Sequence, residues 1–291
     1  MIFLFEKGRD GSHLVSAQEV RSLRPLYHAV CLMIVAAVMG FLMAVPLLAQ
    51  DAAPLTMRGD GTLRDIRLPI LMYHYISTLP ADADKYRINL SVEPAMFRQH
   101  LQYLKDNGYT AVSLYDLDNA LMYGTPLPQK PVILTFDDGY SDHYVTAFPL
   151  LKEFGMTGTF FIITDTADHS SVGYMTWEQI SEMAAAGMSM ESHTKTHADL
   201  RGRSYDFLVY EILGSLESVS AHTGRTGRMF CYPIGHYDDQ TLAVLGATDV
   251  LRAVTTEFGV WHTSDNHLEM PRVRISNDTG VNALASLLRT P

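Results

Sequence analysis

Short apolar segments and amphipathic helical segments alternate along most of this chain, and the alternation restricts its fold more than any other feature. Residues 131–136 (PVILTF) and 159–163 (TFFII) are examples of the apolar segments. They are apolar on both faces, which is typical of parallel strands covered by helices. About seven such repeats in one domain predict an α/β fold that is a closed or nearly closed barrel, with an open doubly wound sheet as the alternative.

The expected elements follow from these periods and from residues that begin or end helices. Ser91 and Thr176 are predicted to begin helices as N-caps, and glycines such as Gly124 and Gly155 to end them. We expect strands at 69–73, 111–114, 131–136, 159–163, 188–192, 228–232 and 253–255. We expect helices between 91 and 108 and at 117–123, 148–154, 176–186, 205–223, 240–245 and 282–288.

The first 50 residues of the chain contain a long apolar segment unlike those of the predicted strands and helices. Residues 29–49 contain no charged side chain and are about as long as the ~20 residues that a membrane-spanning helix needs. We interpret them as an uncleaved signal anchor or a long signal peptide, with a buried core helix as a third possibility. Residues 1–28 are then a cytoplasmic or n-region segment, 50–67 a linker, and 68–291 the folded domain. Both export interpretations place that domain outside the cytoplasm.

Charge and cysteine content exclude several classes of protein. The 291 residues carry a net charge of −10, whereas a nucleic-acid-binding protein usually presents a basic face. Only two cysteines are present, which excludes a disulfide framework and a cysteine-based zinc site. The chain has 12 histidines, which raises the prospect of metal or acid–base chemistry.

Two polar clusters directly follow predicted strands. Asp137 and Asp138 follow the strand at 131–136, and His193 and His197 follow the strand at 188–192. Each cluster alone has an ordinary structural explanation, a turn for the first and a solvated loop for the second. Because both end strands of one parallel sheet, we expect them to open on the same rim, where barrel active sites lie.

Together the two clusters predict a divalent metal site. The His-x-x-x-His spacing is expected to bring both imidazoles to one side of a helical turn. Two histidines and one carboxylate make a three-ligand site with a position open for water. If Asp138 is a ligand, Asp137 is free to act as the general base of a hydrolase. Two-His-one-carboxylate sites also occur in Fe(II) oxygenases, which is the alternative chemistry.

The segments at 135–139 (TFDDG) and 192–197 (SHTKTH) resemble the first two motifs of the polysaccharide deacetylases, also called the NodB-homology domain or carbohydrate esterase family 4. The resemblance runs from about residue 68 to 288. It implies a distorted (β/α)7 barrel that removes N-acetyl groups from glycans with a divalent metal, Zn²⁺ first and Co²⁺ or Ni²⁺ as alternatives. It assigns the base to Asp137 and the metal ligands to Asp138, His193 and His197.

The later motifs depart from the family pattern. The third usually reads Arg-x-Pro-aromatic, but residues 231–235 read CYPIG. By resemblance the backbone N–H of Ile234 stabilises the oxyanion, and Arg272 in Met-Pro-Arg replaces the missing arginine and orients the base. The segment LMYH at 71–74 is similar to that of the biofilm poly-N-acetylglucosamine deacetylases and implies that His74 is the general acid. An imidazole with an ordinary pKa near 6.5 suits this role. Tyr140 and Tyr232 are candidates for the substrate groove.

The sequence therefore predicts an exported, metal-dependent N-deacetylase of an N-acetylglucosamine-containing polysaccharide. Deacetylation of peptidoglycan, chitin-like oligomers or O-acetyl esters is the alternative within the class, and a non-catalytic glycan-binding protein is the alternative outside it. We expect a periplasmic or extracytoplasmic location at the inner membrane, reached through residues 29–49. The expected partners are the polysaccharide, the membrane and separate exopolysaccharide synthesis or export proteins, and no nucleic acid.

Overall fold

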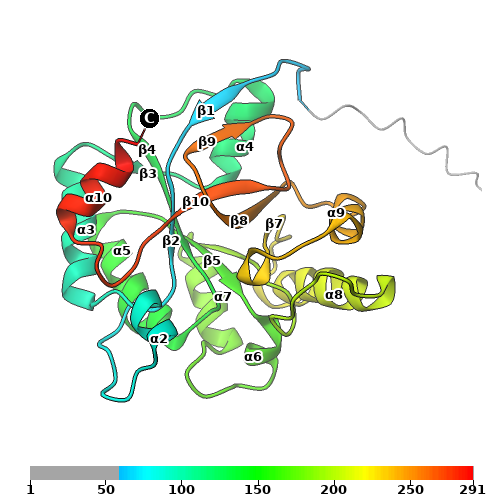
Figure 1. Ribbon diagram of the computed structural model, residues 1–291, viewed down its shortest axis with the longest axis horizontal. Helices are drawn as coiled ribbons and strands as arrows, with labels where there is room; N and C mark the ends of the chain where they lie inside the picture. Colours follow the sequence, from blue (N-terminus) through cyan, green and yellow to red (C-terminus); the bar gives the residue numbers. More distant parts are fainter. Residues whose placement is uncertain (1–58, 291) are drawn as a thin grey trace, which may run out of the picture. The chain divides into compact units, whose positions relative to one another are not determined.

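The computed structural model describes residues 59–290, and seven parallel strands form a closed barrel within them (Figure 1). Their order around the barrel is β2-β4-β5-β6-β7-β8-β10, and β2 closes the ring by pairing with both β4 and β10. The predicted barrel of β/α units is thereby confirmed, and the open sheet is wrong. The strands are β2 (Ile70–Tyr73), β4 (Pro131–Phe136), β5 (Thr159–Ile162), β6 (Ser189–Ser192), β7 (Met229–Cys231), β8 (Arg252–Phe258) and β10 (Met270–Arg274).

The barrel is irregular at two places. The two-residue strand β3 (Thr110–Ala111) pairs with the first two residues of β4, and β2 pairs with the next four. The pairing of β8 with β10 shifts register between Met270 and Arg272. A register shift of this kind re-aims side chains, and such irregularities are common at barrel rims and next to active sites.

Helices follow most strands and lie outside the barrel (Figure 1). The main helices are α3 (Pro94–Asp106), α4 (Leu114–Tyr123), α5 (Phe148–Phe154), α7 (Trp177–Ala185), α8 (Tyr205–Thr223), α9 (Asp239–Gly246) and α10 (Val281–Leu288). Shorter pieces are α2 (Lys85–Leu90), the π-helix η1 (His143–Ala147), α6 (Thr164–Asp168) and the 3₁₀ turn η2 (Pro233–Gly235). The predicted bounds of α5 and α8 are those observed, and Thr176 caps α7 in a capping box.

Ser91 was expected to begin a helix, and this is wrong. Its hydroxyl donates to the carbonyl of Arg87 at 2.6 Å, so Ser91 ends α2. The next helix, α3, begins at Pro94, whose fixed φ angle suits the first helical position.

The core has an inner and an outer part because strand side chains alternate between the two faces. Ile133 and Phe161 point into the barrel, whereas Leu134 and Phe160 pack under the surrounding helices. Three leucines of α4, Leu114, Leu117 and Leu121, join the inner cluster near the beginnings of the strands. Helix α4 therefore covers the N-terminal end of the barrel, and the C-terminal end is left for a site.

Some elements carry no clear periodic signal. Strand β1 (Asp65–Arg67) lies in the predicted linker and pairs antiparallel with β9 (Trp261–Thr263), so the fold begins before residue 68. Strand β10 reads MPRVR, and its proline and arginines do not form an apolar run. Arg272 nevertheless points inward, because a buried carboxylate pairs with it there.

The predicted signal anchor or signal peptide at 29–49 lies outside the described residues. Within residues 59–290, no helix combines the length and hydrophobicity that crossing a bilayer requires.

A buried ion pair links α4 to the barrel, and its loss should destabilise the fold. Arg252 Nε of β8 donates to Asp118 Oδ1 at 2.7 Å, and both side chains are buried. Asp118→Ala leaves the guanidinium charge buried without this carboxylate, so we expect the free energy of unfolding to fall by about 3–5 kcal/mol in urea titrations. The double variant Asp118→Leu/Arg252→Met removes both charges and should recover most of the loss. A double variant as unstable as Asp118→Ala would contradict this account.

Candidate active site

Polar side chains that lie in or directly after four strands meet at the C-terminal mouth of the barrel. Asp137 and Asp138 follow β4, His193 follows β6, His74 follows β2, and Arg272 lies in β10. All except Arg272 line a cavity of about 830 Å³, and Arg272 is buried beneath it. The sequence-based expectation that these side chains share one rim is met by the geometry.

Asp138, His193 and His197 form a tight cluster. Asp138 Oδ1 lies 3.3 Å from His193 Nε2 and 3.4 Å from His197 Nε2. The expected helical turn is wrong, because residues 193–197 form a loop in which Thr194 and His197 have φ angles of 64° and 60°. The loop rather than a helix brings the two imidazoles together.

The donor atoms of this cluster fit a divalent metal ion. The carbonyl of Cys231 can only accept, so His193 Nδ1 donates to it at 2.8 Å, and a neutral imidazole then presents a lone pair on Nε2. Asp138 Oδ1 is buried without a hydrogen-bond donor among the described residues. A tetrahedral ion with ligand bonds of about 2.0–2.1 Å holds its ligand atoms roughly 3.3–3.4 Å apart, which is the spacing around Asp138. The His197 side chain is about 32% exposed, so the cluster borders open space.

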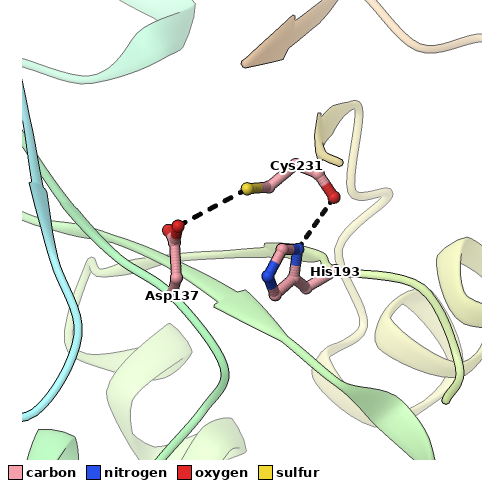
Figure 2. Close-up of side chains that lie close together, drawn as sticks. All are labelled: Asp137, His193 and Cys231. Carbon is pink, nitrogen blue, oxygen red and sulfur yellow. Dashed lines mark hydrogen bonds between the residues drawn. The ribbon is translucent and has the colours of Figure 1, made fainter. Parts of the chain in front are cut away.

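A second group, Asp137, His193 and Cys231, is also compact enough for an ion (Figure 2). Its donor atoms are already engaged or inactive. Both oxygens of Asp137 accept hydrogen bonds from Arg272. Burial raises the pKa of the Cys231 thiol, and only a thiolate is a good metal ligand. The chemistry of the donors therefore favours the group around Asp138.

Arg272 holds Asp137 in a two-point ion pair. Its Nη1 and Nη2 donate to Asp137 Oδ1 and Oδ2 at 2.8 and 2.7 Å. Burial alone would raise the pKa of Asp137, but the charge and hydrogen bonds of Arg272, together with smaller contributions from His74 and His193, outweigh burial and hold this pKa at about 2. Asp137 is therefore ionised at neutral pH with a fixed orientation, as a general base requires.

Cys231 contacts both members of this ion pair. It was not expected from the sequence to be a site residue. Its Sγ lies 3.2 Å from Arg272 Nη2. Figure 2 shows its contact with Asp137, whose Oδ2 lies 3.6 Å from the sulfur. The sequence signal was the cysteine in the third motif, where the family usually has arginine. The small thiol leaves room for the guanidinium of Arg272, which arrives from another strand.

His74 faces the same carboxylate. Its Nε2 lies 3.8 Å from Asp137 Oδ2, and its Nδ1 has no hydrogen-bond partner among residues 59–290. Burial lowers the pKa of His74 to about 4, more than Asp137 and Asp138 raise it. The ordinary pKa expected from the sequence is therefore wrong, and His74 is neutral at pH 7 in the metal-free protein.

Backbone strain concentrates at this mouth. The described chain has five non-glycine residues with positive φ, and four of them, Asp138, Thr194, His197 and Ile234, belong to the site segments. A positive φ is a true outlier for a β-branched residue such as Ile234. At Gly235 a Cβ would lie 2.2 Å from Thr256 Oγ1, so only glycine fits there. Strain of this kind clusters at functional sites and persists only where surrounding contacts enforce it.

The tyrosines divide into two kinds. Tyr140 borders the cavity and stacks on Tyr75, with ring centroids 3.6 Å apart. Tyr232 also borders the cavity, but its side chain is buried and its hydroxyl donates to the carbonyl of Leu268, so it supports the wall. Tyr86 on α2 was not anticipated, because α2 has no clear periodic signal. Its side chain is 66% exposed at the cavity edge.

The fold and the site define the class first: a β/α-barrel hydrolase that places an ionised carboxylate beside a cluster of two histidines and one aspartate. Comparison with known proteins defines the family. Residues 124–252 match the family model described as polysaccharide deacetylase. The protein YxkH of Bacillus subtilis, which is named as a polysaccharide deacetylase, is 34% identical over 215 residues, 74% of each chain.

Two further relatives agree. The poly-beta-1,6-N-acetyl-D-glucosamine N-deacetylase of Staphylococcus epidermidis is 27% identical over 203 residues, 65% of this chain and 70% of that protein. The solved structure of the Streptococcus pyogenes deacetylase PplD in complex with acetate has a TM-score of 0.72 and 31% identity, covering 78% of this chain and all of that one. The chain belongs to the polysaccharide deacetylase family, and this membership identifies a hydrolase that acts on carbon–nitrogen bonds other than peptide bonds.

The two candidate ligand groups can be separated by substitution. We expect the full chain, equilibrated with Zn²⁺ and dialysed, to retain about one ion. His197→Ala removes a ligand of the Asp138 group only and should lose the ion, whereas Cys231→Ala disrupts only the alternative group and should retain it. Metal content by mass spectrometry measures both. The reverse result would show that the ion is held by Asp137, His193 and Cys231.

Proposed function

We propose that this protein is a metal-dependent N-deacetylase of an N-acetylglucosamine-containing polysaccharide outside the cytoplasm, and that it releases acetate. The observation that carries the proposal is the position of Asp137. An ionised, oriented carboxylate lies next to three side chains whose donor atoms are spaced for a divalent ion, at the edge of an open cavity. A glycan-binding protein needs no such base beside a metal site.

The residues that would hold the metal are Asp138, His193 and His197. When bound, a divalent ion of this kind polarises an amide carbonyl and lowers the pKa of water toward about 7. Zn²⁺ is our first choice, and the donors also suit Co²⁺ or Ni²⁺.

Asp137 is the general base of the proposed reaction. It accepts a proton from the water whose oxygen attacks the acetamide carbonyl carbon, and Arg272 keeps the carboxylate oriented during this transfer. The backbone N–H of Ile234, in the strained loop after β7, donates to the oxygen that becomes negative. The oxyanion needs no particular side chain at position 234, which agrees with isoleucine in place of the usual aromatic residue.

His74 is the proposed donor to the leaving nitrogen. Because it is neutral at pH 7 in the metal-free protein, the proton it donates has to arrive during the reaction. Asp137, 3.8 Å away, holds the proton taken from water and is the nearest source. The C–N bond breaks as His74 protonates the nitrogen, and acetate and a free amine leave. The low pKa of His74 makes its protonated form a strong acid, which favours this second transfer.

The substrate assignment has two supports. The cavity is large enough for sugar units, and the relative from Staphylococcus epidermidis is named for poly-beta-1,6-N-acetyl-D-glucosamine. The proposed location depends on residues 29–49, which are apolar and uncharged. The membrane and separate synthesis or export proteins are the proposed partners.

The decisive experiment measures acetate release by the full chain from β-1,6- and β-1,4-linked N-acetylglucosamine oligomers, with and without a chelator. We expect chelator-sensitive release, and a fall in kcat of about 10²–10⁴-fold for Asp137→Asn with metal content unchanged, because the isosteric amide cannot accept the proton. Asp206→Asn, on the exposed first turn of α8, is the matched control and should keep the wild-type kcat.

Other outcomes redirect the proposal. Release from peptidoglycan or O-acetyl esters alone would replace the substrate and keep the chemistry. Binding of oligomers without release from any substrate, unchanged in Asp137→Asn, would identify a glycan-binding protein instead.

Tyr86 tests whether the cavity edge binds sugar rings. An exposed aromatic ring at this edge can stack on a sugar, and its removal costs binding rather than chemistry. For Tyr86→Ala we expect KM for oligomers to rise roughly fivefold, if the ring contributes about 1 kcal/mol, with kcat unchanged. Tyr205→Ala, which removes an exposed tyrosine of α8, should leave KM unchanged. A wild-type KM for Tyr86→Ala would show that Tyr86 does not contribute to substrate binding.

A further inference from the structure

Glu211 lies outside every motif discussed above, yet it contacts the loop that carries two metal-ligand candidates. It lies on α8 and its side chain is fully buried. One carboxylate oxygen, Oε2, accepts from the backbone N–H groups of Lys195 and Thr196 at 3.0 and 2.9 Å. The other, Oε1, accepts from the Thr196 hydroxyl at 2.6 Å. Three donors from two consecutive loop residues thus point at one carboxylate.

The loop needs such a partner because of its conformation. Residues 193–197 belong to no helix or strand, and two of them have positive φ angles. A positive φ in a non-glycine residue costs of order 1–3 kcal/mol and persists only if the surroundings enforce it. The N–H groups that Glu211 binds lie between these two strained residues, Thr194 and His197.

The side chain of Lys195, whose backbone N–H binds Glu211, does not form an ion pair with this carboxylate. Lys195 Nζ donates instead to Asp168 at 2.9 Å and to Ser218 at 3.3 Å. Burying a carboxylate costs free energy unless its hydrogen bonds repay the loss of water. For Glu211 the hydrogen bonds given above all come from the loop, so the buried charge stabilises this loop conformation in particular.

A glycine in the middle of α8 points to the same close approach. Gly214 has ordinary helical geometry, and glycine inside a helix costs about 1 kcal/mol relative to alanine. A Cβ at Gly214 would lie 3.1 Å from Lys195 Cδ. The absence of a side chain therefore lets the Lys195 side chain cross α8 and keeps the loop against the helix, one turn from Glu211.

We propose that Glu211 is a positioning residue, which fixes the 193–197 loop so that His193 and His197 face Asp138 before a metal ion binds. It touches neither substrate nor ion. Partners of this kind set ligand orientation, and their loss typically weakens metal affinity about 10–100-fold. The inference rests on the metal site of the proposed function and not on its substrate.

The test measures Zn²⁺ affinity by competition with a chromophoric chelator, on the full chain. For Glu211→Ala we expect affinity to fall about 10–100-fold. Glu211→Gln should restore most of it, because the amide oxygen can accept from both N–H groups and the amide nitrogen can donate to the Thr196 hydroxyl. Glu217→Ala, an exposed change on the same helix, is the matched control and should keep the wild-type affinity.

A purely structural role predicts a different result. Glu211→Ala would then unfold at a lower temperature but bind Zn²⁺ with wild-type affinity, and this would overturn the proposal. A glutamine variant as weak as the alanine variant would also overturn it. If Glu211→Ala does not fold, Glu211→Asp decides. The shorter side chain holds the carboxylate back from the loop, so this variant should bind Zn²⁺ more weakly than the glutamine variant does, and wild-type affinity would refute the proposal.

The same experiments separate this inference from the proposed function. Chelator competition needs no substrate, so the expected order of affinities can hold in a protein that releases no acetate. In an active protein, Glu211→Ala at limiting Zn²⁺ should lower kcat and leave KM unchanged, and excess Zn²⁺ should recover much of the loss.

Discussion

The buried ion pair between Arg272 and Asp137 is the contact on which the mouth of the barrel depends. Arg272 of β10 binds Asp137 after β4, the hydroxyl of Thr135 in β4, the carbonyl of Thr255 in β8 and the sulfur of Cys231 at the end of β7. One guanidinium therefore connects four strands at the depth where the cavity begins. Burying either charge without its partner would cost free energy. The pair therefore restricts how far the strands that it connects can move apart. The same contact keeps the carboxylate ionised, which makes it both a structural and a chemical element.

A second layer of contacts enforces the strained segments around this pair. The carbonyl of Cys231 orients the His193 ring, Glu211 holds the loop between His193 and His197, and the N–H of His197 donates to the hydroxyl of Thr194. These partners come from β7, α8 and the loop itself. The strand ends alone do not determine the geometry of the site, because helices packed on the outside of the barrel also shape it.

The sequence predicted the helices and strands whose apolar residues recur with a regular period. The strand at 131–136 and the helices at 148–154 and 205–223 have the predicted bounds, because apolar repeats and terminal glycines or cap residues mark them. It also predicted that one rim of the barrel carries four site residues, Asp137, Asp138, His193 and His197. It missed β10 because a strand that carries an inward arginine does not show the apolar run of a buried strand. The His-x-x-x-His spacing predicted a helical turn, but residues 193–197 form a loop. The conformation of this loop depends on Glu211, which is distant in sequence. The pKa of His74 depends on burial, which no local pattern encodes.

Because β2 closes the ring, the complete site depends on contacts between parts of the chain that are far apart in sequence. Strand β2 pairs with β4 and also with β10, so residues near 70 lie beside residues near 273. Asp137 and Arg272 are 135 positions apart, and no short stretch of chain contains more than a fraction of the site. Closing contacts of such long range costs loop entropy, and proteins rich in them fold slowly. The contact that orients Asp137 therefore needs the closed ring, because Arg272 comes from the last strand along the chain, whereas Asp138, His193 and His197 follow the nearby strands β4 and β6.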